Sequence, residues 1–560
     1  MPVNDLAIQS ERLHQKGFVA NIISNDMTTN ATEIMEHISP ATLNELLGYR
    51  VARHPEKVAL IFKDRRWTYL EFEREANRVA HGLKNIGVKK GGKIAFVLPN
   101  CAEFLFAVFA VTKIGAVFVP LNPAGTADEA EYVLRHSEAS VCLTSPDLLP
   151  LIGSVRGKLP DLTQVIVTGH HEAPDATSWN EFLSGVPDEA LDATTDPEEM
   201  ASITYTSGTT DRPKGVMLSQ YAYAFAPRMR AEGLGWKEND RVLCLLPLFH
   251  VNALCHMCIA MLSVGGTIVL TERFSASRFW DEVREYGITT SSLMRTIPQI
   301  LLALPEKPDD RDNPLRLAVA LLPPEMHVRF EERFDLKAVP SYSLTEDILS
   351  VIGPREMPRG KLGSCGLPLA PQAHRLQIFD DSGNPLPPGE AGEIVKQSPT
   401  VMKGYYKNPE ATSKALKHGW LYTGDLGYLD DDGYLYFVDR LKDMVRRGDE
   451  NISSEEVERV LNSHPQVAES AVIGVPDQIR GEEVKAYVVL KPPATAESVP
   501  PEAIWNLCRF HLATFKVPRY IEYRAELPKT PSSKVQKNVL RAESQQPTGL
   551  VYDRLARSQA

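Results

Sequence analysis

The sequence has few cysteines, no excess of positive charge and no long apolar run, and each absence excludes a class of protein. Its 560 residues include seven widely scattered cysteines, which is not the pattern of a disulfide-stapled secreted domain and fits a reducing compartment. Cys255 and Cys258 have a spacing seen in metal sites, but no second pair completes one, so core packing is the expected role. The net charge of -11 argues against broad binding to nucleic acid.

The most apolar stretch, "LCHMCIAMLSVGGTIVL", is interrupted by His256, Gly265 and Gly266. It is too broken to cross a bilayer and predicts a helix, a turn and a strand. The N-terminus lacks a basic start followed by an apolar core and a cleavage site, so no signal peptide is expected. These features predict a cytoplasmic chain without a membrane span.

What the sequence does contain is a regular alternation of helix and strand patterns from residue 41 onward. Amphipathic stretches such as "FEREANRVAHGLKNIGV" are followed by short apolar runs such as "KIAFVLP". This alternation predicts an α/β fold with doubly wound parallel sheets, in which ligand loops lie at the carboxyl ends of strands. After about residue 362, short alternating strands with Gly and Asp turns predict an antiparallel, barrel-like region. Beyond residue 442, Ser453 and Ser454 predict the N-terminal cap of a helix, with two strand patterns after it.

One loop resembles a phosphate-holding loop. The stretch "YTSGTTDRPKGVMLS" runs from Tyr205 to Ser219, directly after a strand pattern. It offers hydroxyls, backbone freedom and a positive charge through Thr206, Ser207, Gly208, Thr209, Thr210 and Lys214. Asp211, however, places a carboxylate where a polyphosphate is expected to lie.

Five motifs together identify a family. They are "YTSGTTDRPKGV", "PLFHVN", "SYSLTE", "GWLYTGDLGYLDDDGYLYFVDRLKD" and "PKTPSSKVQK", in this order along the chain. Over nearly its whole length the chain resembles the adenylate-forming superfamily of acyl-CoA synthetases, adenylation domains and luciferases. Members of this family join a carboxylate to ATP, release pyrophosphate, rotate a small C-terminal domain, and let a thiol attack the acyl-adenylate. "GDENISSEEVE" and "RGEEVKAYVVLK" resemble the CoA ligases, so CoA is the expected thiol.

The family fold implies a large N-terminal region of two doubly wound α/β subdomains plus a β-barrel-like subdomain, and a small, mobile α+β C-terminal domain. On this chain the predicted divisions are a loosely ordered segment at 1–40, an AMP-binding domain at 41–441, the mobile domain at 442–545 and a tail at 546–560.

The resemblance also assigns residues to roles. Nucleotide binding falls to Thr206, Ser207, Gly208, Thr209, Thr210, Lys214, Tyr342, Asp425 and Arg440. Catalytic or gating roles fall to His250 between the acyl pocket and the thiol tunnel, Thr345 and Glu346 at the α-phosphate, Lys442 at the hinge, and Lys534 at the departing pyrophosphate. If adenylation is retained, Glu346 is the expected Mg²⁺ ligand, with Thr206 as a weaker candidate.

Outside this context each residue has an ordinary interpretation. Asp425 and Glu346 alone would be turn or surface acids, His250 a buried core histidine and Lys534 a solvated lysine. Only their place in five ordered motifs assigns them to a site. The acids from Asp430 to Asp432 keep the ordinary interpretation, a turn rather than a metal site.

Four positions that are glycine in the family differ here, at Asp211, Ser343, Asp449 and Ser533. The stretch "RLAVALLPPE" also lacks the small glycine-alanine loop that the family places against adenine. Glycine in a ligand loop allows close backbone approach, so each replacement adds bulk or costs conformational freedom. Asp449 falls in the loop that lines the thiol tunnel in the family.

Asp211 has the largest expected effect. Two like charges about 5 Å apart repel by about 3 kcal/mol at an effective dielectric near 20. A triphosphate carries several negative charges and an adenylate about one, so the penalty falls on ATP more than on the acyl-adenylate. The leading hypothesis is therefore an acyl-CoA ligase that forms the thioester from an acyl-adenylate and CoA, with ATP-dependent adenylation weakened or lost. A separate adenylating enzyme would then be a partner.

Two alternatives remain. One is a complete ATP-dependent ligase that converts an acid, ATP and CoA to acyl-CoA, AMP and pyrophosphate. The other is a noncatalytic binder of nucleotide or acyl group. The expected pocket segments, "PLFHVNALCHM", "SSLMRTIPQ" and "AVALLPPE", are mostly apolar. They favour an apolar acid of medium or large size, such as a natural-product acid, over an amino acid.

Overall fold

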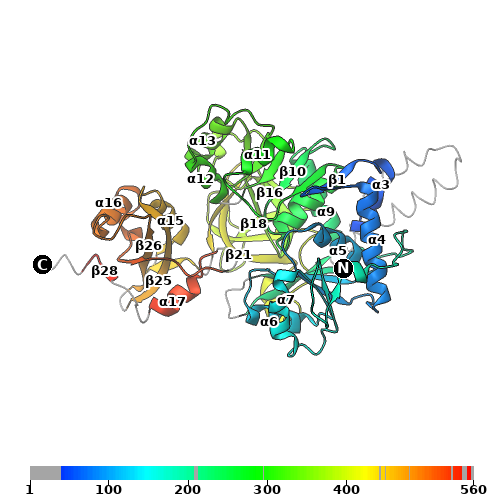
Figure 1. The fold of residues 1–560 in the computed structure, drawn as a ribbon. Coiled ribbons are helices and arrows are strands. Elements are labelled where there is room, and N and C mark those ends of the chain that lie inside the picture. Colours follow the sequence, from blue (N-terminus) through cyan, green and yellow to red (C-terminus); the bar gives the residue numbers. More distant parts are fainter. Residues whose placement is uncertain are drawn as a thin grey trace.

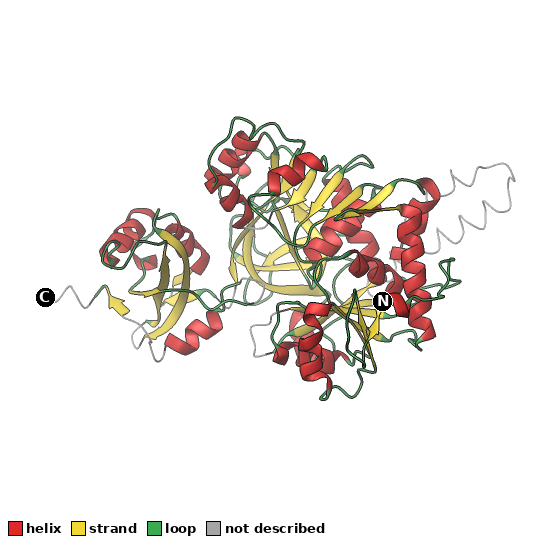
Figure 2. Cartoon of the chain, viewed as in Figure 1, coloured by secondary structure: helices red, strands yellow, loops and turns green. Residues whose placement is uncertain are grey.

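The computed structural model describes residues 40–206, 212–293, 296–440, 443–447, 450–477, 480–530, 534–544 and 551–555. Figures 1 and 2 show a larger N-terminal body, in which helices flank several sheets, and a smaller C-terminal body that carries the end of the chain. The predicted fold class, a mixed α/β fold with a large N-terminal and a small C-terminal domain, is confirmed. The predicted boundary at residues 441 and 442 lies outside the described residues, and the division into four segments stays a prediction.

Two seven-stranded sheets form most of the larger body. The first has, in spatial order, β14 (Lys337–Val339), β13 (Leu317–Val319), β12 (Thr290–Ser292), β10 (Arg241–Cys244), β11 (Thr267–Leu270), β1 (Val58–Phe62) and β2 (Arg65–Thr68). The second has β7 (Thr177–Ser178), β6 (Gln164–Val167), β5 (Val141–Thr144), β3 (Lys93–Val97), β4 (Val117–Pro120), β8 (Met200–Thr206) and β9 (Lys214–Ser219). Each is parallel except for its last pair, β1 with β2 and β8 with β9.

Helices connect and cover these strands, as the alternation predicts. They are α3 (Leu43–Arg53), α4 (Tyr69–Asn85), α5 (Ala102–Lys113), α6 (Ala127–Ser137), α7 (Leu149–Arg156), α8 (Trp179–Phe182), α9 (Gln220–Gly233), α10 (Ala260–Ser263), α11 (Phe279–Glu285), α12 (Thr296–Ala303), α13 (Pro324–Phe334) and α14 (Pro409–Ala415). A π-helical segment, η2 (Asn252–Ile259), precedes α10, and the 3-10 turns are η1 (Pro146–Leu148), η3 (Arg359–Lys361) and η4 (Thr514–Lys516).

Helix α5 is apolar on nearly every side and is enclosed by the core. Its sequence, AEFLFAVFAVTK, is buried from Phe104 to Lys113, as expected for a helix without a polar face. The same apolar cluster contains residues of both sheets, such as Leu60 of β1 and Phe96 of β3. A shared core therefore fixes the strand ends of the two sheets relative to one another.

The strand order reverses at β10 in the first sheet and at β3 in the second. The carboxyl end of β10 leads to His250, and the carboxyl end of β8 leads to the segment 207–211. Open α/β sheets bind ligands at the carboxyl ends of their strands. The fold thus brings the predicted gate and the predicted phosphate loop to the ligand-binding edge of each sheet.

The antiparallel strands predicted after residue 362 are present. A three-stranded sheet contains β15 (Ser341–Leu344), β16 (Asp347–Ile352) and β17 (Leu367–Pro368), and a five-stranded sheet contains β18 (Arg375–Phe379), β19 (Gly392–Gln397), β21 (Trp420–Leu429), β20 (Leu416–Lys417) and β22 (Leu435–Arg440). In the turn after β21, Asp430 and Asp432 accept hydrogen bonds from Lys361. The acidic turn is thus an ion-paired turn.

The C-terminal body is one mixed sheet with three helices. Its strands are β24 (Glu450–Ile452), β23 (Val445–Arg447), β26 (Gly481–Leu490), β27 (Tyr520–Arg524), β28 (Val551–Asp553) and β25 (Val467–Asp477), and its helices are α15 (Ser454–Asn462), α16 (Pro501–His511) and α17 (Lys537–Ser544). Ser453 caps α15 through the backbone N–H of Glu456 at 3.2 Å, as predicted. Part of the predicted tail is a strand, since β28 pairs with β27.

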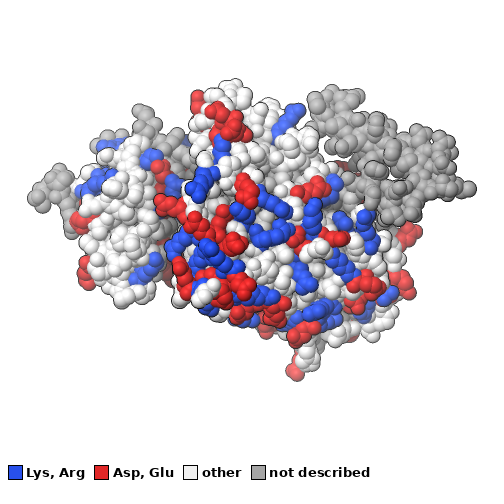
Figure 3. Space-filling view, turned by 90° about the horizontal axis from the view of Figure 1, so that it is seen from above, with Lys and Arg blue, Asp and Glu red and all other residues white. Residues whose placement is uncertain are grey.

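Figure 3 shows the charge on one face of the molecule. Acidic and basic side chains are interspersed there, and no broad surface of a single sign covers the described residues on that face. Among the described helices, none combines the length and the apolar character needed to cross a membrane.

Candidate active site

Asp425, Tyr342 and Arg440 form a cluster between two sheets. The phenol of Tyr342 on β15 donates to Asp425 Oδ2 at 2.8 Å, and Arg440 Nε lies 2.7 Å from Asp425 Oδ1. The register of β21 and β22 places Asp425 directly opposite Arg440, so the pairing of the strands aligns the two charges. Asp425 is 1% exposed. Burial, and then the neighbouring Asp425 carboxylate, raises the pKa of Tyr342, so the phenol stays protonated and donates.

Thr345 and Glu346 form the turn between β15 and β16. Glu346 is held at two points: its carbonyl accepts from the backbone N–H of Met402 at 2.7 Å, and its Oε1 accepts from the phenol of Tyr405 at 2.9 Å. The ring of Tyr405 also receives Lys214, whose Nζ lies 4.6 Å from the ring centroid. Tyr405 therefore connects the predicted metal ligand to the lysine of the predicted phosphate loop.

A buried ion pair lies directly behind this turn. Asp347 follows Glu346, and its carboxylate lies 2.8 Å from Lys396 Nζ, with both side chains at 0% exposure. Ser398 and Thr400 donate to the same carboxylate at 2.8 and 2.5 Å. Burial raises the pKa of Asp347, but the charge of Lys396, that of His374 and the hydrogen bonds from Lys396 and Thr400 together hold that pKa below its usual value. The turn that carries Glu346 is thus anchored by a charged network.

The ends of the predicted phosphate loop lie opposite one another. Thr206 on β8 pairs in register with Lys214 on β9. Gly215 follows at a close contact, since a Cβ there would lie 2.6 Å from a methyl carbon of Ile203. The middle of the loop, Ser207, Gly208, Thr209, Thr210 and Asp211, lies outside the described residues.

His250 is partly buried after β10, and its ring lies tilted by 38° against that of Phe249, with the ring centroids 4.0 Å apart. Burial, helped by the positive charge of Lys534, lowers the pKa of His250 to about 4. The imidazole is therefore neutral near pH 7. The charge of Lys534, from the C-terminal body, therefore lies within electrostatic range of His250. Thr530 contacts the backbone of Lys534 twice: its hydroxyl accepts from the Lys534 N–H at 3.1 Å, and its own N–H donates to the Lys534 carbonyl at 2.7 Å.

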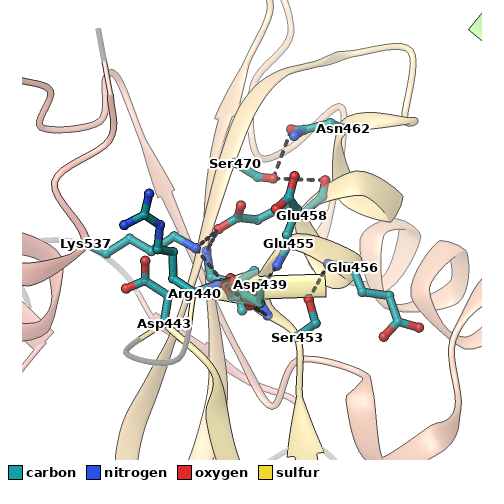
Figure 4. Close-up of polar contacts among 12 residues, drawn as sticks. Asp439, Arg440, Asp443, Ser453, Glu455, Glu456, Glu458, Asn462, Ser470 and Lys537 are labelled. Carbon is teal, nitrogen blue, oxygen red and sulfur yellow. Dashed lines mark hydrogen bonds and ion pairs between the residues drawn. The ribbon is translucent and has the colours of Figure 1, made fainter. Parts of the chain in front are cut away.

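Lys442 lies outside the described residues, but the segments on either side of it contact each other. Figure 4 shows Asp439, at the end of β22, pointing at the N-terminus of α15. Its Oδ2 accepts from the backbone N–H of Ser454 at 2.5 Å, from the Ser454 hydroxyl at 2.8 Å and from the backbone N–H of Glu455 at 3.4 Å. A carboxylate is favourable at a helix N-terminus. Asp439 thus ties the larger body to the first helix of the smaller one.

Comparison with known proteins agrees with this geometry. The family model described as AMP-binding enzyme matches residues 47–406, and the one described as AMP-binding enzyme C-terminal domain matches residues 456–534. The chain belongs to the AMP-binding enzyme family.

Relatives of this AMP-binding enzyme are acyl-CoA ligases. A crotonobetaine/carnitine–CoA ligase of Salmonella heidelberg (strain SL476) is 35% identical over 522 residues, which cover 90% of this chain and all of the relative. The crystal structure of the anthranilate CoA ligase AuaEII with anthranoyl-AMP is similar, with a TM-score of 0.83, 31% identity and coverage of 90% of this chain and 97% of that one. The o-succinylbenzoate coenzyme A synthetase MenE of Bacillus subtilis, with AMP, gives a TM-score of 0.77, 31% identity and coverage of 89% and 98%.

Several predicted residues of this AMP-binding enzyme come together, and others lie outside the described residues. Tyr342, Asp425 and Arg440 form one group, Glu346 and Lys214 meet at Tyr405, and His250 lies near Lys534. Ser343 is exposed on β15. Outside the described residues are the loop positions 207–211 together with Lys442, Asp449 and Ser533.

Sequence reasoning missed Tyr405, the Asp347–Lys396 pair and Asp439. The contacts of Tyr405 and the Asp347–Lys396 pair join segments far apart in the chain, and Asp439 contacts a helix that begins 15 residues after it. The stretch "GYYKNPE" around Tyr405 has one glycine, one lysine and one glutamate, a pattern that by itself indicates no site. The available signals were positional, since Asp347 follows Glu346 and Asp439 precedes Arg440.

The residues present fit a magnesium ion that binds together with the phosphates of a nucleotide. The described residues contain no group of three or more His, Cys, Asp or Glu side chains placed to hold a metal. Mg²⁺ is commonly bound through one or two carboxylates together with substrate phosphates rather than by a full protein cage. Glu346, held in place by Tyr405, supplies such a carboxylate.

Proposed function

We propose that this AMP-binding enzyme is a complete ATP-dependent carboxylic acid–CoA ligase. The main support is the geometry of two groups: the buried carboxylate–phenol–guanidinium cluster of Asp425, Tyr342 and Arg440, and Glu346, which Tyr405 anchors. The acyl-CoA ligases to which the chain is similar add to this, two of them in structures with AMP or an acyl-adenylate.

In the first half-reaction a carboxylate oxygen of the acid attacks the α-phosphorus of ATP. The bond from that phosphorus to the bridging oxygen breaks, and pyrophosphate leaves with the electron pair. Asp425 would accept hydrogen bonds from the ribose hydroxyls, while Tyr342 and Arg440 hold its carboxylate in place. Lys534 would offset the charge that develops on the leaving pyrophosphate. Mg²⁺, held by Glu346 with Thr206 as a weaker candidate, would supply positive charge to the phosphates when bound.

In the second half-reaction the CoA sulfur, having lost its proton, attacks the acyl carbon of the adenylate. The bond from that carbon to the phosphate oxygen breaks and AMP leaves. His250 is neutral near pH 7 because its pKa is about 4, so it would line the path without adding charge. Lys442 would be the hinge that turns the C-terminal domain between the two steps.

The substrate is proposed to be an apolar carboxylic acid. The buried residues of η2, which follows His250, are Ala253, Leu254, Cys255, His256, Met257, Cys258 and Ile259. The names of the relatives specify different acids, so the comparisons do not identify which acid this chain uses.

Asp211 favours a second candidate, thioester formation alone from an acyl-adenylate made by a separate enzyme. Its carboxylate would repel a triphosphate more than an adenylate. Asp449 opposes this candidate if it narrows the thiol tunnel. The comparisons favour the complete ligase.

A paired assay decides between the candidates. Purified protein, CoA and Mg²⁺ receive either ATP with a panel of apolar acids or the matching synthetic acyl-adenylates, and acyl-CoA is measured by mass spectrometry. Acyl-CoA in both reactions supports the complete ligase. Acyl-CoA from the adenylates alone contradicts it and supports the second candidate, in which case Asp211→Gly should restore pyrophosphate release. Acyl-CoA in neither reaction contradicts both and indicates a binder.

A further inference from the structure

Tyr405 contacts two charged groups that the proposed reaction needs together. Its phenol donates to Glu346 Oε1 at 2.9 Å, and its ring lies 4.6 Å from the ammonium of Lys214. Glu346 comes from the β15–β16 turn, whereas Lys214 begins β9 of a different sheet. One side chain, 8% exposed, therefore joins an acid and a base from separate parts of the fold.

The backbone around Tyr405 is fixed to the phosphate-loop strand. Tyr405 forms an antiparallel bridge with Val216, and the flanking N–H groups of Lys403 and Tyr406 donate to Met217 and Gly215 at 2.8 and 2.7 Å. The N–H of Tyr405 itself donates to the Thr412 hydroxyl at 2.9 Å. These contacts fix the position of Tyr405. We infer that its side chain holds Lys214 and Glu346 in place, and not the reverse.

The chemistry of the Tyr405 side chain suits this role. Its hydroxyl donates a hydrogen bond to the Glu346 carboxylate. The ring face attracts the ammonium through its negative quadrupole. The two interactions use different parts of one side chain, so they can be removed separately.

We propose that Tyr405 is a positioning residue for the adenylate-forming half-reaction, which holds Lys214 and Glu346 at a fixed separation. The inference rests on the proposed function. A triphosphate with its divalent cation needs an ammonium and a carboxylate at set positions, because the ammonium meets phosphate oxygens while the carboxylate meets the cation. An acyl-adenylate has no β- and γ-phosphates. Tyr405 therefore serves nucleotide activation and has little part in thioester formation.

Two substitutions separate the two contacts. Tyr405→Phe removes the hydroxyl and keeps the ring, and Tyr405→Leu removes both. The matched control is Tyr406→Phe, because the neighbouring phenol donates instead to Glu138 at 2.9 Å on the surface. Thermal unfolding and circular dichroism confirm that each variant is folded before the other measurements are compared.

The first readout is calorimetric binding of ATP with and without Mg²⁺, which needs no turnover. For Tyr405→Phe we expect Mg²⁺-dependent ATP affinity to fall about tenfold, as for loss of a hydrogen bond to a charged group, with Mg²⁺-free affinity unchanged. For Tyr405→Leu both affinities should fall, the Mg²⁺-free one about threefold because the cation–π contact is lost. Tyr406→Phe should match the parent protein.

The second readout is the rate of each half-reaction. Pyrophosphate release should need a higher Mg²⁺ concentration in Tyr405→Phe, whereas thioester formation from a synthetic adenylate should stay within about twofold of the parent, since that step involves no β- or γ-phosphate. Equal losses in both half-reactions, or an unchanged Mg²⁺ dependence of ATP binding, would overturn the proposal.

A parent protein that binds Mg²⁺-ATP but releases no pyrophosphate contradicts the complete ligase alone, because ATP binding still tests the role of Tyr405. A parent protein that binds no ATP overturns the proposal for Tyr405 as well.

Discussion

The phenol oxygen of Tyr342 lies 2.8 Å from the carboxylate of Asp425, although the two residues belong to different sheets. Arg440 occupies the other carboxylate oxygen from the strand beside Asp425. The carboxylate is therefore held from both sides and needs little rearrangement to bind the ribose that we propose as its ligand. Preorganisation of this kind lowers the entropy that binding must overcome.

Tyr342→Phe should weaken nucleotide binding. The substitution leaves the ring in place and removes one donor to a buried charged acceptor, which contributes about 1.5–3 kcal/mol. We expect KM for ATP to rise about tenfold or more with a smaller change in kcat. Steady-state pyrophosphate release, or AMP binding by calorimetry, measures the effect. The control is Tyr428→Phe on β21, the strand that carries Asp425, since Tyr428 stacks on Tyr436 with ring centroids 4.8 Å apart. A fall in kcat with unchanged KM would contradict a binding role.

Removing one partner of the buried pair Asp347–Lys396 should destabilise the fold more than removing both. Lys396→Met leaves a carboxylate uncompensated at 0% exposure, and breaking a buried pair by removing one partner costs about 3–5 kcal/mol. The double variant Lys396→Met/Asp347→Leu should recover most of that loss, because no charge is left buried. Urea unfolding followed by tryptophan fluorescence measures both. Lys414→Met, from a pair whose side chains are 72% and 80% exposed, is the control and should change stability by less than about 0.5 kcal/mol. A double variant as unstable as the single one would contradict this argument.

Local sequence periodicity predicted the helices and strands. It did not predict the side-chain contacts between segments that are distant in the sequence. The alternation around "KIAFVLP" predicts β3 and its flanking helices because burial of one face depends on near neighbours. The pairing of Asp425 with Arg440 follows the register of adjoining strands that lie in one motif. Tyr405 could not be assigned in this way, since Lys214 and Glu346 belong to two different sheets and neither is near Tyr405 in the sequence. The effect of Asp211 stays a hypothesis, as that residue lies outside the described ones.

His250 should not titrate near the ordinary histidine pKa. Burial and Lys534 lower its pKa from 6.5 to about 4, so in the folded enzyme it stays neutral until the pH approaches 4. In the unfolded chain it takes up a proton near 6.5. Between these values the unfolded state binds more protons, and the stability that neutral His250 allows is fully present above about 6.5 and is lost as the pH falls toward 4.

Two measurements test this. Histidine-labelled carbon NMR, with His250→Gln to identify the resonance, should show no titration of His250 between pH 5 and 8. In the same variant the loss of stability between about pH 6.5 and 4 should be smaller than in the parent, because one titrating group has been removed. A His250 resonance that titrates near 6.5 would contradict the buried, neutral assignment.

Asp439 should favour the arrangement in which Lys534 lies near His250. Asp439 precedes the proposed hinge at Lys442, and α15 follows it, so rotation at the hinge would separate the carboxylate from the helix N-terminus that it contacts. Asp439 is 3% exposed and accepts from Ser454 and Glu455. Asp439→Asn keeps the shape and removes the charge that favours a helix N-terminus by about 1 kcal/mol. Adenylate formation, which uses Lys534, should slow about fivefold for a loss of that size, whereas thioester formation from a synthetic adenylate should be unchanged or faster.

The comparison of half-reactions separates this role from a general loss of structure. Single-turnover assays of pyrophosphate release and of acyl-CoA formation from the adenylate measure the two rates in one preparation. Glu410→Gln is the matched control, because Glu410 also places a carboxylate at a helix N-terminus, but as part of the exposed helix α14 itself and not across the hinge. Equal slowing of both half-reactions by Asp439→Asn would show that the carboxylate only stabilises α15. Slowing confined to pyrophosphate release means that breaking this contact is part of the change from the first step to the second, since the charge then stabilises one domain arrangement over the other.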